Sequence, residues 1–237
     1  MTNSDIHSFE ALLIKKFPVG ESDIAVTLFT ERRGKIRAFA KNAASSRKRF
    51  GGRLEPFTLL NIELTETRGG RKVLQSSEIV KSFEDVANNM SIFLKANCVL
   101  EIIDSAVTAE DVPCEDLFTE AADALCEMSK GKGFSPMLRF QTASLKSLGY
   151  GIDFSRCAVC GGRKPERGFL VFPSGEFLCA PCGRKCAEKP ARSIQLKDGT
   201  KNAARAQINI NCLNDFFQYQ TGAVLKSAKL LENMLTL

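Results

Sequence analysis

Along the first eighty residues, apolar and polar positions alternate in short stretches with the two-residue period of β-strands. These stretches are rich in β-branched and aromatic residues, and turn sequences such as PVGESD, ERRG and TRGGR separate them. In IRAFAK, residues 36–41, three aliphatic side chains alternate with an arginine, a phenylalanine and a lysine, so one face is expected to pack inward. Five strands are predicted, at residues 9–17, 24–30, 34–42, 56–67 and 72–83, and five short strands fit a small barrel.

After Phe83 the apolar residues follow the 3.6-residue period of helices. Helices are predicted at residues 90–107, 116–128, 136–150, 209–222 and 225–235. The chain is therefore predicted to be an α+β protein in two parts. A five-stranded barrel occupies residues 1–80, and an α-helical domain with a cysteine-bearing insert at 157–182 occupies residues 81–237.

The insert contains two Cys-x-x-Cys pairs, formed by Cys157 with Cys160 and Cys179 with Cys182. Their C-x2-C-x18-C-x2-C spacing is typical of four-cysteine zinc sites, and the glycines that follow each pair suit the tight turns of such sites. Four thiolates fill a tetrahedral coordination shell and leave no position for a catalytic water. The sequence therefore predicts a structural Zn²⁺ ion.

Other uses of these thiols fit the pattern less well. A redox Cys-x-x-Cys normally opens a helix in a βαβ setting, whereas CAVC follows a predicted helix. Ferredoxin-type iron–sulfur spacings are more compact, and unbound thiols are a further alternative. Cys186, four residues after Cys182, is another candidate ligand, although a spare thiol is the simpler interpretation.

Composition indicates an ordinary globular protein with reduced cysteines. The 237 residues are 44% hydrophobic and 25% charged, and the nine cysteines are odd in number, with three standing singly in apolar helical contexts. No apolar run of membrane-spanning length is present, and the N-terminus MTNSDIHSFE does not resemble a signal peptide. We expect a soluble, cytoplasmic protein that does not bind membranes.

The net charge of +6 is concentrated at the two ends of the chain, and one stretch of the predicted barrel has nine cations and no acidic residue. Phe39 and Phe50 lie among these cations, as in a nucleic-acid groove, although a solvated charged surface is the alternative. The barrel has no tryptophan or tyrosine, so phosphate contacts are expected to dominate, with little sequence preference. The predicted nucleic-acid-binding residues are Arg32, Arg33, Lys35, Arg37, Phe39, Lys41, Arg47, Lys48, Arg49 and Arg53.

Signatures of catalysis are missing from the sequence. It contains no GxxxxGK[ST] loop, no GxGxxG and no GxSxG, and the single histidine, His7, is expected to be an ordinary surface residue. The sequence therefore argues against an enzyme.

Taken in order, several segments resemble the bacterial RecO family of recombination mediators over nearly the whole chain. LLIKKFPVGESDIAVTLFTERRGKIRAFAKNA and RFGGRLEPFTLLNIEL are similar to that family's N-terminal oligonucleotide-binding (OB) barrel. MLRFQTASLKSLGYGIDFSRCAVCG is similar to the helix that leads into its zinc segment, and GEFLCAPC to the second cysteine pair.

The resemblance implies a function that composition does not indicate. Members of the family bind single- and double-stranded DNA, anneal complementary strands, and work with RecR to load RecA onto DNA coated by single-stranded DNA-binding protein. They contact the C-terminal tail of that protein through the helical domain. The resemblance also implies a cytoplasmic, nucleoid-associated location. Some members lack the cysteines, as expected for a metal with a structural role. YQTGAVLKSAKLL matches the family's basic C-terminal helix start only loosely, which leaves a role for Lys226 and Lys229 in partner binding open.

Two other classes of function share features of this sequence. A zinc-containing adaptor would dock acidic proteins on its basic barrel and touch DNA only incidentally. A zinc-dependent nuclease or deaminase is disfavoured, because the predicted ligand set is closed and no H-x-E signature is present.

Overall fold

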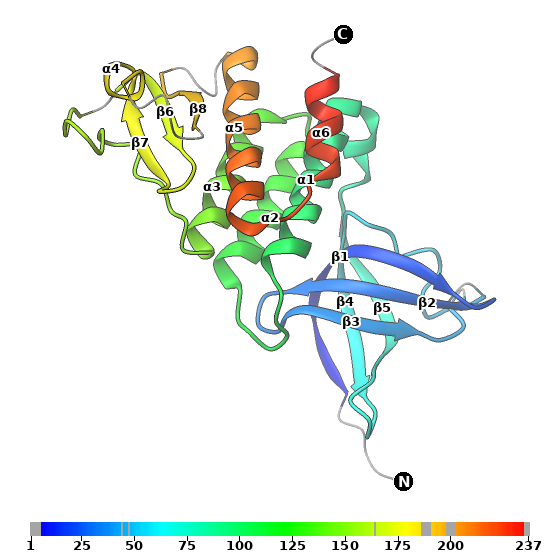
Figure 1. Cartoon of the computed structure of the whole chain (residues 1–237). Coiled ribbons are helices and arrows are strands. Elements are labelled where there is room, and N and C mark those ends of the chain that lie inside the picture. The colour runs from blue at the N-terminus through cyan, green and yellow to red at the C-terminus, as the bar shows by residue number, and fades with distance from the viewer. Residues whose placement is uncertain are drawn as a thin grey trace. The chain divides into compact units, whose positions relative to one another are not determined.

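A computed structural model of the chain describes residues 6–43, 45–46, 48–163, 165–185, 191–197 and 202–234 (Figure 1). These residues form two compact units. Unit 1 combines residues 1–87 with 107–129, and unit 2 combines residues 88–106 with 130–237.

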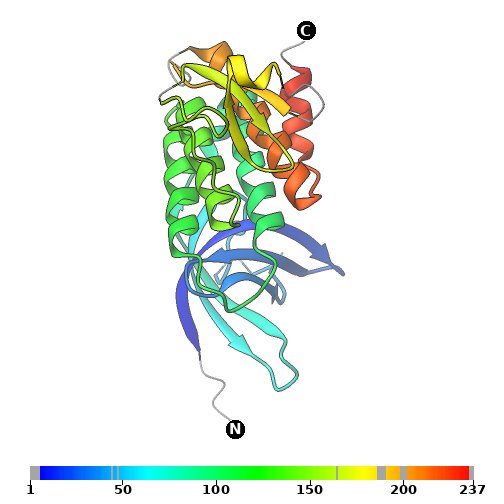
Figure 2. The ribbon, with the colours of Figure 1, turned by 60° about the vertical axis from the view of Figure 1, so that its left-hand side comes forward.

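Unit 1 contains a closed barrel of five strands, which Figure 1 and Figure 2 draw in blue to cyan from two sides. The strands follow the order β1-β2-β3-β5-β4, and every neighbouring pair is antiparallel except β3 and β5. This is the OB-type barrel expected from the sequence, with all five predicted strands present. The strands are β1 (His7–Val19), β2 (Asp23–Thr30), β3 (Gly34–Ala40), β4 (Thr58–Glu66) and β5 (Lys72–Ser82).

Helices are the main secondary structure outside the barrel strands, and the predicted helical segments are confirmed. They are η1 (Glu84–Asn88), α1 (Met90–Ala106), α2 (Glu115–Ser129), α3 (Phe134–Ser147), α4 (Ala180–Gly183), α5 (Ala203–Thr221) and α6 (Lys226–Asn233).

The barrel core is built from alternate residues of each strand. On β3, Ile36, Ala38 and Ala40 are fully buried in the core, while Arg37 is exposed, as the alternation predicts. The loop after β3 also contributes to this core, because Phe50 is buried among the strand residues. The expectation that Phe50 lies in a nucleic-acid groove is therefore wrong, since the loop turns this ring into the apolar interior.

One helix belongs to the barrel unit although it follows α1 in the sequence. The ring of Phe118 on α2 lies 5.6 Å from that of Phe29 on β2, and the carboxylate of Asp111 pairs with the Arg33 guanidinium at 2.7 Å. The compact units thus differ from the division expected at residue 80 in the placement of residues 81–87 and 107–129. An amphipathic pattern indicates that one face of a helix is buried, but it does not name the surface that buries it.

Unit 2 is held together by polar contacts between distant segments as well as by its apolar core. The Gln141 side chain on α3 donates to Ile210 O at 3.0 Å and to Asn214 Oδ1 at 2.7 Å on α5. At the start of α6, the carboxylate of Glu101 on α1 accepts from the backbone N–H and the hydroxyl of Ser227, at 3.1 and 3.2 Å. An α1 side chain therefore caps the N-terminus of α6.

The cysteine insert and the segment that follows it form an antiparallel sheet that the sequence does not predict. It consists of β6 (Arg167–Val171), β7 (Glu176–Cys179) and β8 (Ala191–Gln195), in the order β7-β6-β8. Gly168 on β6 leaves room for its neighbour, because a Cβ at this position would lie 2.0 Å from the Leu178 carbonyl oxygen. The sheet therefore requires glycine at that position.

Candidate metal centre and nucleic-acid surface

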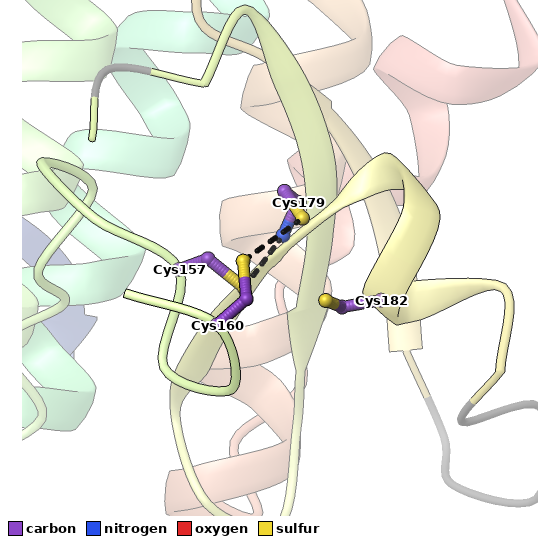
Figure 3. A group of neighbouring side chains, drawn as sticks. All are labelled: Cys157, Cys160, Cys179 and Cys182. Atoms are coloured by element: carbon purple, nitrogen blue, oxygen red, sulfur yellow. Dashed lines mark hydrogen bonds between the residues drawn. The ribbon is translucent and has the colours of Figure 1, made fainter. Parts of the chain in front are cut away.

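The four predicted ligand cysteines meet at one end of this sheet (Figure 3). Cys157 and Cys160 lie on the loop before β6, Cys179 ends β7, and Cys182 lies in α4. All four sulfur atoms lie within 4.8 Å of one another, and those of Cys160 and Cys179 are 3.8 Å apart. Zinc–sulfur bonds of about 2.3 Å in a tetrahedron would separate the sulfurs by about 3.8 Å, so the cluster has the size of a four-thiolate metal site.

Tight backbone turns bring the first cysteine pair into place. The N–H of Gly161 donates to Cys157 O and the N–H of Cys157 to Gly162 O, each at 2.9 Å, and Gly161 has a φ of 68°. The positive φ is the reason why glycine suits this turn, as expected. Gly183 serves a different purpose, because a Cβ there would lie 2.3 Å from the Phe169 ring.

The electrostatics of the cluster require a cation if all four thiols are to be ionised. Burial raises the pKa of Cys157, but the backbone N–H groups of Cys160, Cys179 and Val159 outweigh this effect and lower it to about 6. Hydrogen bonds with the thiols of Cys179 and Cys160 raise the pKa of Cys182 to about 12. One thiolate thus forms readily, whereas the last cannot form beside three other sulfurs unless a positive ion neutralises them.

The other described cysteines lie outside this centre. Burial raises the pKa of Cys98 in α1, and it raises that of Cys212 in α5 to about 12, as expected for thiols packed in apolar cores. Cys186, the additional candidate ligand, lies outside the described residues.

The outer face of β3 carries part of the predicted nucleic-acid surface. Arg37 and Lys41 are exposed, and the half-buried ring of Phe39 lies between them in sequence. The guanidinium of Arg71 stands 5.5 Å from the centre of the Phe39 ring. Sequence analysis missed Arg71, although the turn TRGGR between two predicted strands was a signal that this cation would reach the barrel surface. We call Arg37, Phe39, Lys41 and Arg71 the β3 row.

Some of the predicted cations form ion pairs or hydrogen bonds within the protein. Arg33 pairs with Asp111, as described above. Arg49 donates to the Lys41 carbonyl oxygen at 2.7 Å, and Arg53 donates to the Ser77 carbonyl oxygen at 3.0 Å. The last two arginines therefore hold the loop after β3 against the barrel, a task that a count of charges does not reveal.

The remaining predicted cations are spread more widely. Lys48 is exposed on the loop, and Lys35 is partly buried on β3. Arg32 is exposed in the turn between β2 and β3, where it lines a cavity of about 770 Å³ together with Phe9 and other residues. Arg47 lies outside the described residues. The structure thus brings together only part of the predicted set.

The fold and the cysteine cluster define a class of protein in which an OB-type barrel is combined with a helical unit that carries four cysteines within metal-binding distance of one another. Residues 1–83 match the family model described as Recombination protein O N terminal, and residues 93–217 match Recombination protein O C terminal. The chain belongs to the RecO family of DNA repair proteins.

Individual relatives support this assignment. A DNA repair protein RecO of Myxococcus xanthus is 33% identical over 193 residues, which cover 81% of this chain and 79% of the relative. That of Geobacter metallireducens is 35% identical over 179 residues, 74% of this chain and 72% of the relative. That of Thermodesulfovibrio yellowstonii is 29% identical over 177 residues, 74% of this chain and 70% of the relative.

Family membership assigns the protein to DNA repair and recombination. Within the part of the chain that the structure describes, every helix is too short or too polar to cross a membrane.

Proposed function

We propose that the protein is a recombination mediator that binds single- and double-stranded DNA and anneals complementary strands without catalysing a covalent reaction. Together with RecR, it helps to load RecA onto strands coated by single-stranded DNA-binding protein. It contacts the C-terminal tail of that protein through its helical unit and works at the nucleoid. The observation that carries the DNA-binding part is the β3 row, in which cations flank an aromatic ring on the outer face of an OB-type barrel.

The chemistry of the β3 row suits annealing. Arg37 and Lys41 can neutralise phosphates, while the Phe39 ring and the Arg71 plane offer a surface on which bases stack. Arg37 and Phe39 are alternate residues of β3, so their side chains point the same way and are about 6.6 Å apart. Lys41 follows directly after the strand, so the row extends along β3 rather than forming a closed pocket. A DNA strand held mainly through its phosphates keeps its base edges free for pairing.

We propose that the four cysteines hold a Zn²⁺ ion. Tetrahedral coordination by four thiolates is typical of zinc, and the closed ligand set gives the ion a structural role. The bound ion would join the loop before β6, the end of β7 and α4, which are the three segments that supply the sulfurs.

Strand annealing tests the proposal. Complementary oligonucleotides, one fluorescent and one carrying a quencher, are mixed with the protein, both bare and coated with single-stranded DNA-binding protein, in the absence of ATP. The protein should accelerate duplex formation on both substrates. The variant Arg37→Ala/Lys41→Ala should lose most of this acceleration, because two phosphate contacts are gone.

The matched control is Lys130→Ala/Lys146→Ala, which removes two exposed cations from unit 2. It should anneal like the unaltered protein. If the unaltered protein fails to bind naked oligonucleotides in a salt-sensitive way but still binds acidic proteins, it is an adaptor rather than a DNA-binding mediator.

A further inference from the structure

A lysine and a cysteine lie in direct contact within unit 1. Lys81, near the end of β5, donates a hydrogen bond from Nζ to the Sγ atom of Cys126 on α2 at 2.8 Å. Lys81 is exposed and Cys126 is half-exposed, so small solutes reach the pair. The Lys81 ammonium also lies 5.6 Å from the centre of the Phe83 ring, and this contact helps to hold the amine beside the sulfur.

The surroundings of Cys126 differ from those of Cys114, the other half-exposed cysteine of unit 1. The thiol of Cys114 donates to the Val112 carbonyl oxygen at 3.4 Å, and burial raises its pKa. A cation beside a thiol favours the thiolate, the form that reacts with peroxides, whereas burial disfavours it. Cys126 therefore has the surroundings of a reactive cysteine and Cys114 those of an inert one.

We propose that Lys81 and Cys126 form a reversible covalent cross-link when the protein meets hydrogen peroxide. The Cys126 thiolate attacks one peroxide oxygen, and the O–O bond breaks. Cys126 is thereby oxidised to a sulfenic acid, the peroxide is reduced, and one water forms with a proton from the Lys81 ammonium, which becomes a neutral amine. The neutral Lys81 amine then attacks the sulfur, an S–N bond forms, and the hydroxyl leaves as a second water after accepting a proton from the nitrogen.

Reduction reverses the cross-link. Two molecules of a thiol reductant restore the Cys126 thiol and the Lys81 amine and become one disulfide. The cross-linked form ties β5 of the barrel to α2, which is the helix of unit 1 that follows α1 in the sequence. Oxidation thus joins covalently two segments that otherwise meet through packing and hydrogen bonds.

Mass spectrometry of the full-length protein tests the cross-link. The protein is treated with hydrogen peroxide, its remaining thiols are alkylated, and it is digested with trypsin without reductant. The expected product joins the peptides of Lys81 and Cys126, is lighter by two hydrogen atoms than their sum, remains uncut after Lys81, and disappears with dithiothreitol. Peroxide-treated protein in which Cys126 stays reduced, or oxidises without joining Lys81, overturns the proposal.

Two variants separate the roles of the charge and the amine. Lys81→Arg keeps the cation but not the primary amine, so Cys126 should still oxidise to a sulfenic acid, trapped by a cyclic 1,3-dione, without cross-linking. Lys81→Met removes the cation and should slow Cys126 oxidation by about three- to tenfold. Cys114, measured in the same digests, is the internal control and should not change between variants. Equal oxidation rates for Cys126 in the unaltered protein and in Lys81→Met would show that the lysine does not activate it.

Discussion

The side chain of Asn209 on α5 forms hydrogen bonds with both backbone groups of Gln195 on β8, as the backbone of a neighbouring β-strand would. Its side-chain amide donates to Gln195 O at 2.7 Å, and its side-chain carbonyl accepts from the Gln195 N–H at 2.8 Å. On its other side, β8 pairs with β6, so this one side chain continues the hydrogen bonding of the sheet onto a helix. The contact joins the cysteine-bearing sheet to the helices of unit 2.

Replacing Asn209 with alanine should destabilise unit 2 by about 2 kcal/mol, because two partly buried backbone groups lose their partners. The free energy of unfolding, measured in urea, checks this value. Asn211→Ala is the matched control on the same helix, since the Asn211 side-chain carbonyl accepts from the side chain of Gln207 rather than from a backbone N–H. The control should cost less than about 1 kcal/mol. Equal losses in the two variants would contradict the strand-like role of Asn209.

Lys95 should make the stability of unit 2 depend on pH. It is 1% exposed, its ammonium donates to Ser91 Oγ at 2.6 Å, and burial lowers its pKa from 10.5 to about 8. Between these two values the unfolded chain holds a proton that the folded protein lacks, so the free energy of unfolding rises with pH through this window. Below pH 8 the lysine is charged in both states, and this gain, at most about 3 kcal/mol, is absent.

The variant Lys95→Met isolates this effect. It should unfold with a free energy up to about 3 kcal/mol higher at pH 7, because a charge no longer has to be buried, and this difference should shrink as the pH rises from 8 to 10.5. Urea unfolding of both proteins from pH 7 to 10.5 measures it. Lys146→Met, an exposed position on α3, should follow the unaltered protein throughout. A constant difference between Lys95→Met and the unaltered protein across this range would argue against the buried charge as its cause.

DNA affinity should depend on salt through the β3 row. Each phosphate contact to a single strand contributes about −0.7 to the slope of log affinity against log salt concentration, so Arg37→Ala/Lys41→Ala should flatten the slope by up to about 1.4. Phe39→Ala should weaken binding without changing the slope, because stacking releases no counterion. Fluorescence anisotropy with a labelled oligonucleotide over a salt series measures both. An unchanged slope in the double variant would move the DNA site to another surface.

Metal removal should unfold the cysteine insert but not the barrel, which supplies none of the clustered sulfurs. Purified protein should contain about one zinc ion per chain, and Cys157→Ser should lose it along with the protease resistance of β6, β7 and β8. Elemental analysis and limited proteolysis check these outcomes. Cys114→Ser, which changes a cysteine outside the cluster, should retain both properties. Full zinc content in Cys157→Ser would refute the assigned ligand set.

The barrel could be predicted from the sequence because its signal is local. Each strand shows its buried face in its own alternation, and Ile36, Ala38 and Ala40 are buried as that pattern requires. The signal for the metal site is equally local, since the spacing of the two cysteine pairs alone indicates a shared metal. The sheet around them was missed because its strands are only four or five residues long, too short for a clear period.

What the sequence did not reveal depends on contacts between distant residues. The charge of Arg53 led to the prediction that it binds DNA, but its guanidinium donates a hydrogen bond to the Ser77 carbonyl oxygen. No local sequence pattern reveals such a partner. Phe50 is a similar case. Its neighbours in the sequence are cations, but its side chain is buried in the core of the barrel. Arg71 shows the opposite case, because the fold places its guanidinium over the ring of Phe39, a residue 32 positions earlier in the chain.

The cap that Glu101 provides for Ser227 has a consequence for the order in which the protein is made. The two residues are 126 positions apart, so α1 leaves the ribosome well before α6 has been synthesised. At about 5–20 residues per second, this delay lasts roughly 6 to 25 s. Throughout that time all the barrel strands have been synthesised, whereas α1 still lacks α6, the helix against which it packs. The nascent chain therefore passes through a stage in which apolar surface of α1 is open to chaperones, and unit 2 reaches its final fold only after α6 has emerged.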